Sequence, residues 1–150
     1  MNAQIIFFQD SRNVNNKEFN YGIHIEDPVW DEVKDCDEIV IPYKKFVLEL
    51  EFPLARSFRF PLKIDCEEGF TRKTIIKCIS IIYKYIYKME QKTTSIPLSP
   101  HPSYRFKRGV TNGIFGIWGH SLEDLVLHSI VYNNKKKCYQ AVVLGDFILS

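Results

Sequence analysis

His120 and Asp124 are the residues whose spacing most suggests acid–base chemistry. The string Ser121-Leu122-Glu123-Asp124 resembles a capping box, in which a serine and an acidic residue three positions later close the first turn of a helix. Such a turn would bring Asp124 close to the His120 imidazole, and a histidine oriented by a carboxylate can act as a general base. The cap alone explains Asp124 equally well, and the chain has no G-x-S-x-G nucleophile motif. A hydrolase centred on His120 and Asp124 is therefore the third of three functional hypotheses.

Trp118 is the residue best suited to contact a partner. It ends a short apolar segment, Ile114 to Trp118, which contains Gly116 and is followed by Gly119. Aromatic residues in short, glycine-flanked strands usually pack inward, so the first expectation is a strand whose tryptophan belongs to the core. The alternative is that Trp118 forms a pocket wall that receives a partner's side chain. On this alternative Trp118 and Arg72 are the partner-binding residues of a non-enzymatic interaction protein, which is the leading hypothesis.

Basic residues gather in three places that could together bind phosphate groups. Tyr104 or Phe106 could then stack on a base, giving a sequence-nonspecific nucleic-acid-binding module. The net charge of +2 does not indicate such a partner by itself, and lysine-rich helix faces and polar hairpin loops are common without any ligand. Nucleic-acid binding is therefore the alternative hypothesis. Its candidate residues are Lys73, Lys77, Lys84 and Lys88 on a helix, Arg105, Lys107 and Arg108 in a connection, and Lys135, Lys136 and Lys137 in a hairpin loop.

Cysteine spacing and glycine content give no sign of a metal or a cofactor. The four cysteines, Cys36, Cys66, Cys78 and Cys138, include no C-x-x-C pair, which predicts reduced thiols and no structural zinc. No phosphate-binding loop or dinucleotide fingerprint occurs, so no cofactor is predicted. No basic segment precedes the short apolar run near the N-terminus, and no uncharged apolar stretch is long enough to cross a membrane. We therefore expect an intracellular protein without a membrane partner.

The longest regular pattern predicts a helix from Arg72 to Gln91. Its apolar residues recur every 3.6 residues, which indicates one stripe packed on a sheet with lysines facing outward. Thr71 is the expected N-cap. The stripe consists of Ile75, Ile76, Ile79, Ile82, Tyr83, Ile86 and Met89.

Alternating residues predict a strand pair at Phe46 to Phe52 and Ser57 to Ile64, joined by a short turn. Pro61 marks the second strand as an edge, because proline has no amide hydrogen to donate. Antiparallel pairing would set Glu49 near Arg59 on the water-facing side of the sheet. Further strands are expected at residues 3–9, 21–25, 114–118, 125–132 and 138–144, the last two joined by a hairpin loop over 133–137.

These elements predict a single α+β domain over residues 1–150, since 150 residues is the size of one domain. A mostly antiparallel sheet would pack against one long amphipathic helix at about 72–91. A homodimer is compatible with this fold, because Pro61 and the final hairpin would leave sheet edges exposed.

Two blocks resemble a known family. One is Gly69-Phe70-Thr71-Arg72-Lys73-Thr74 with the helix end Tyr85-Ile86-Tyr87-Lys88-Met89-Glu90, and the other is Gly113-Ile114-Phe115-Gly116-Ile117-Trp118-Gly119-His120 continuing to Leu127. Together they look like a family of small proteins without assigned activity from giant DNA viruses of amoebae and from fungi. The resemblance covers about the last 85 residues and brings no functional residues with it. It implies a viral factor associated with the virion or with infection.

Overall fold

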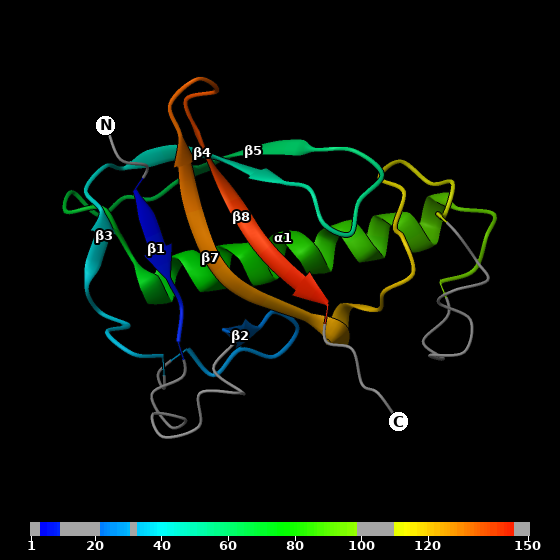
Figure 1. Ribbon diagram of the computed structural model, residues 1–150, viewed down its shortest axis with the longest axis horizontal. Coiled ribbons are helices and arrows are strands. Elements are labelled where there is room, and N and C mark those ends of the chain that lie inside the picture. The colour runs from blue at the N-terminus through cyan, green and yellow to red at the C-terminus, as the bar shows by residue number, and fades with distance from the viewer. Residues whose placement is uncertain (1–3, 10–21, 31–32, 99–109, 146–150) are drawn as a thin grey trace.

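One long helix lies across one face of a six-stranded sheet (Figure 1). The computed structural model describes residues 4–9, 22–30, 33–98 and 110–145. The predicted α+β fold is confirmed: five strands follow the order β1-β7-β8-β4-β5, and β2 also pairs with β7. A separate two-stranded sheet joins β3 and β6. The elements are β1 (Ile5–Phe7), β2 (Ile23–His24), β3 (Ile39–Ile41), β4 (Lys45–Leu50), β5 (Phe58–Lys63), β6 (Phe70–Thr71), α1 (Arg72–Thr93), the 3₁₀ turn η4 (Leu122–Asp124), β7 (Leu125–Asn133) and β8 (Cys138–Gly145).

The helix α1 begins and packs as its sequence predicts. The Thr71 side chain accepts a hydrogen bond from the Thr74 amide at 3.1 Å, which satisfies one of the amides left open at a helix start. The helix ends at Thr93, two residues beyond the predicted end. The buried members of the predicted stripe, which join the core shared with the sheet, are Ile75, Ile76, Ile79, Tyr83 and Ile86.

The strands β4 and β5 form the predicted antiparallel pair, and Glu49 lies opposite Arg59. The strand β5 is an edge, as Pro61 predicts. Glu49, however, does not face water: only 3% of it is exposed, so its predicted surface position is wrong. The reason is that β8 lies along the other side of β4. Gln140 from β8 and Lys136 from the hairpin tip donate hydrogen bonds to the Glu49 carboxylate at 2.7 and 3.2 Å.

The contact between β4 and β8 is short and parallel. It pairs only Leu48 with Tyr139 and Glu49 with Gln140, although both strands continue beyond these residues. In Figure 1, β8 runs diagonally away from β4 and β5. The final hairpin, β7 with β8, therefore lies inside the sheet rather than at an edge, contrary to the expectation above. On each side of the short contact, the diverging strands leave a hollow.

The predicted strand at 114–118 is not formed. Only isolated bridges occur there, joining Ile117 to Leu54 and Trp118 to Val110. Amides that a strand would use for pairing are bound instead by the Glu90 carboxylate of α1. The 3₁₀ turn after Ser121 and the β7–β8 hairpin do follow the prediction.

Candidate functional site

A groove with a mainly apolar lining lies beside Trp118. Its volume is about 570 Å³, within the range of ligand-binding clefts. One wall is the turn at residues 51–55, another is Val110 with Trp118, and the third is β8 at residues 141–143. Glu51, at the exposed start of the turn, is the charged residue of this lining.

Trp118 is exposed rather than buried in the core. Its exposed fraction is 45%, so the expectation that it packs inward is wrong, and the pocket-wall alternative describes its position. The bridges at Ile117 and Trp118 hold the backbone extended, and successive side chains of an extended chain point to opposite sides. Ile117 is fully buried, so Trp118 points outward. The Trp118 amide donates to the Pro53 carbonyl at 2.8 Å, which fixes its position against the neighbouring turn.

Three side chains of α1 hold the segments that form the groove. The Tyr83 hydroxyl donates to the Phe52 carbonyl at 2.7 Å, and the Tyr87 hydroxyl donates to the His120 carbonyl at 2.8 Å. Glu90 holds the loop between Val110 and Trp118. Helix positions separated by three, four or seven residues share one face, so a single face of α1 positions all three segments.

Glu90 is fully buried and is the anchor of this loop. Its carboxylate accepts hydrogen bonds from the Thr111 hydroxyl and from the amides of Gly113, Phe115 and Gly116, at 2.8, 2.9 and 3.2 Å for the three amides. Burial alone would raise the pKa of Glu90, but these hydrogen bonds to the ionised form together lower the pKa below its ordinary value. A charged carboxylate inside the protein thus replaces the strand pairing that the loop lacks.

Glu90 was not among the predicted functional residues, although the sequence carries a signal for its buried position. Glu90 continues the apolar stripe at the spacing set by Ile79, Tyr83 and Ile86. An acidic residue in a buried stripe needs several hydrogen-bond donors. The glycine-containing loop at residues 111–116 supplies them.

Acid is expected to destabilise the protein through Glu90 and Glu49. The pKa of Glu49 is also lowered, chiefly by the Gln140 hydrogen bond, against burial, with further contributions from Arg59 and Lys136. A carboxyl whose pKa is lower in the folded state stabilises the fold above its unfolded pKa, about 4.3, and this stabilisation is lost as the pH falls through the folded pKa. We expect the melting temperature to fall as the pH is lowered below about 5. Thermal scans from pH 7 to 3 test this, and a Glu90→Gln variant should show a shallower fall.

His120 and Asp124 lie together but inside the protein, each with 3% of its side chain exposed. The His120 Nδ1 atom is 4.0 Å from an Asp124 carboxylate oxygen. That oxygen accepts from the Ser121 amide, as in a capping box, and also from the Ser121 hydroxyl. The imidazole packs against Phe52 and Trp118, with ring centroids 5.1 and 5.3 Å away. This packing supports the groove walls, so the geometry favours a positioning role for His120 over acid–base chemistry.

Of the predicted partner-binding and basic residues that the structure describes, only Trp118 lines the groove. Arg72 lies near the start of α1, where it donates to the Phe7 and Asp35 carbonyls and pairs with Glu38, and it does not line the groove. On α1, Lys84 and Lys88 are exposed, whereas Lys73 and Lys77 are half-buried. Of the hairpin lysines, Lys136 binds Glu49, Lys137 lines the second hollow and Lys135 is exposed. Arg105, Lys107 and Arg108 lie outside the described residues.

Comparison with known proteins found no matching family model, no matching curated protein and no matching solved structure. Within the described ranges, no helix has the length and apolar character that a membrane span requires. The same ranges contain no cluster of His, Cys, Asp or Glu side chains arranged for a metal ion. The functional proposal therefore rests on the geometry of the groove.

Proposed function

We propose that this protein is a non-enzymatic interaction module that binds an extended, apolar segment of a partner protein in the groove beside Trp118. The observation that carries the proposal is a half-exposed tryptophan whose backbone is fixed on both sides. Tryptophan is strongly enriched among the residues that dominate binding energy at interfaces. A rigid position lowers the entropy lost on binding, which favours affinity.

The open side of β8 favours an extended segment over a helix. Between Ala141 and Gly145, β8 pairs with β7 on one side, and the described structure has no strand on the other side, where the groove lies. Strands direct alternate amides and carbonyls to each side, so this edge can accept a further strand. Peptides that bind in this way gain affinity from main-chain hydrogen bonds and specificity from alternate side-chain pockets.

The groove lining predicts the composition of the partner segment. Phe52, Trp118 and Val143 offer apolar surface for side chains on one face of an added strand. Glu51 is exposed at the rim, and a lysine or arginine in the segment would complement its charge. The resemblance of the block from Gly113 to Leu127 to proteins of giant viruses supports placing such a module among virion- or infection-associated factors.

Replacing Trp118 by alanine is expected to weaken peptide binding at least tenfold, because the indole forms a wall of the groove. The free energy of unfolding of this variant should change little, because the Trp118 side chain is already 45% exposed. A random dodecapeptide library displayed on phage and selected on the wild-type protein alone provides the probes. Selected peptides should carry alternating apolar residues and a basic residue, and N-methylation of alternate amides should abolish their binding.

The matched control is Ile81→Ala, which removes an apolar side chain that is 68% exposed on α1. This variant should bind the selected peptides like the wild type. Peptides that bind Trp118→Ala as tightly as the wild type would exclude the groove as the site. Selected peptides that tolerate N-methylation at every position would exclude strand addition.

A further inference from the structure

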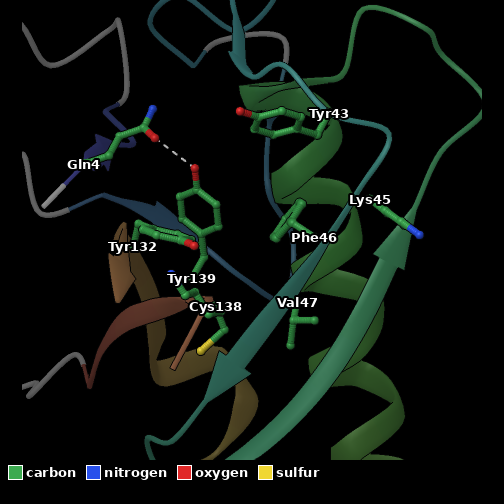
Figure 2. Close-up of a pocket in the computed structure, with 9 residues that line it drawn as sticks. Gln4, Tyr43, Lys45, Phe46, Val47, Tyr132, Cys138 and Tyr139 are labelled. Atoms are coloured by element: carbon green, nitrogen blue, oxygen red, sulfur yellow. Dashed lines mark hydrogen bonds between the residues drawn. The ribbon is translucent and has the colours of Figure 1, made fainter. Parts of the chain in front are cut away.

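The second hollow, on the other side of the short β4–β8 contact, combines aromatic rings with positive charge (Figure 2). Its volume is about 420 Å³. Figure 2 shows the rings of Tyr132, Tyr139 and Phe46 gathered together with Tyr43 across from them, while the Lys45 side chain points away from the rings. The remaining lining comes from Gln4, Val47, Lys137 and Cys138.

The rings form a connected, partly accessible wall. Tyr139 stands edge-on to Tyr132 and to Phe46, with centroids 5.1 and 5.3 Å apart. Its hydroxyl donates to the Gln4 side-chain oxygen at 2.9 Å, which keeps the inner ring in place. Burial raises the pKa of Tyr139, and the neighbouring Tyr132 and Tyr43 add to this rise. Tyr43 is 65% exposed and offers a ring to a flat ligand.

The lysines around the hollow are not paired with carboxylates in the described part of the chain. Lys45 lies directly opposite Lys63 across the β4–β5 pair, and like charges in such positions repel. The hollow has no acidic residue among its described lining. Within the described ranges, no carboxylate lies within ion-pair distance of Lys45, Lys63 or Lys137; the nearby Glu49 and Glu67 bind Lys136 and Lys44 instead. A phosphate at the mouth of the hollow would give Lys137 a counter-charge.

Lys137 occupies a backbone conformation that ordinarily favours glycine or asparagine. Its φ angle is 57°, in the left-handed region, where a lysine is strained. Hairpin ends commonly use glycine at such positions. The lysine therefore stands at a position where glycine would fold more favourably, and it lines the hollow. Backbone strain of this kind is often associated with a binding role.

We propose that this hollow binds a nucleotide, with the base against Tyr43 and Tyr132 and the phosphate at its mouth on Lys137. Bases stack on aromatic side chains without regard to sequence, and lysine ammonium groups bind phosphate oxygens. A free mononucleotide and one residue of a single strand share this chemistry. The site is separate from the Trp118 groove and does not depend on the peptide-binding proposal.

Replacing Lys137 by glycine separates a ligand role from a structural one. The variant should bind a fluorescein-labelled octamer of uridylate or thymidylate about tenfold more weakly, because a charge-assisted hydrogen bond is lost. Its melting temperature should rise by about 2 °C, because glycine relieves the left-handed conformation. The matched control is Lys135→Gly, which removes the same charge from the same loop at a residue that does not line the hollow. This control should bind within about threefold of the wild type and should not gain stability.

Fluorescence anisotropy with the octamers and calorimetry with mononucleotides give the affinities, and the wild-type affinity should fall as salt rises. Tyr43→Ala should weaken binding about tenfold, whereas Tyr43→Phe should retain it because stacking needs only the ring.

Mononucleotide binding equal to octamer binding identifies a free nucleotide as the ligand, and octamer binding alone identifies a single strand. The proposal is overturned if wild-type protein binds none of these probes at millimolar concentration, if Lys137→Gly binds like the wild type, or if a phosphotyrosine peptide binds in preference.

Discussion

Replacing Glu90 by glutamine is expected to lower the free energy of unfolding by about 3 kcal/mol or more. The buried carboxylate accepts four hydrogen bonds, from the Thr111 hydroxyl and from the amides of Gly113, Phe115 and Gly116. Glutamine has a similar shape but only one oxygen, and its amide group would turn two N–H donors toward backbone N–H donors. Buried donors left unsatisfied cost about 1–3 kcal/mol each, and hydrogen bonds to charged groups are the stronger ones.

The loss of these hydrogen bonds should also affect the position of Trp118. Thr111 links Glu90 to Ile117, because its hydroxyl receives the Ile117 amide at 2.8 Å, and Trp118 follows directly. We therefore expect Glu90→Gln to change the fluorescence of Trp118 and to weaken binding of the selected peptides at pH 7, even where the protein remains folded.

Urea unfolding followed by circular dichroism measures the stability change, with the exposed Glu68→Gln as the matched control. The control makes the same chemical change at the surface and should shift stability by less than about 0.5 kcal/mol. A Glu90→Gln variant that unfolds at the same urea concentration as the control would show that the loop is held by something other than this carboxylate.

Replacing Gly69 by alanine should likewise cost about 3 kcal/mol or more. The φ angle of Gly69 is 111°, which L side chains rarely adopt, and an added Cβ would lie 2.1 Å from the Ile41 carbonyl oxygen and 2.9 Å from the Pro42 Cα. Both neighbours are backbone, so relief requires moving β3 or β6. Such a movement would disturb the pairing of Phe70 with Ile41 and, one residue on, the Thr71 cap of α1.

The neighbouring Glu68→Ala variant is the control for this change. Glu68 is exposed, so removing its side chain should alter the melting temperature little. Thermal unfolding of both variants by calorimetry gives the comparison. Equal melting temperatures for Gly69→Ala and Glu68→Ala would mean that the chain just before β6 can shift against β3 without affecting the helix start.

Local patterns were sufficient to predict the helix and the longer strands of this fold, although they missed β3 and β6 and predicted a strand at 114–118 that is not formed. The 3.6-residue stripe predicted α1, alternation predicted β4 with β5, and apolar runs flanking a polar loop predicted β7 with β8. Thr71 as a cap and Pro61 as the mark of an edge strand were also predicted correctly. Each of these features depends on residues close together in the chain, where hydrogen bonding and side-chain period are determined locally.

The sites were decided by contacts between distant segments. Glu49 is buried because β8, about 90 residues later in the chain, lies beside β4. No local sequence pattern predicts that these two strands are neighbours. Trp118 points outward because the chain is extended there and the preceding Ile117 is buried against distant segments, whereas the sequence alone favoured the opposite orientation. Which face of an extended segment is buried depends on its neighbours and register.

The amino-acid sequence by itself thus determined the helix, the two main hairpins and the α+β class, because these follow from short-range periodicity. Only the tertiary structure decided that β4 and β8 touch for two residues and then diverge, and this divergence produces both hollows. The physical reason is that strand order and crossing are determined by burial of the whole core, to which every segment contributes at once.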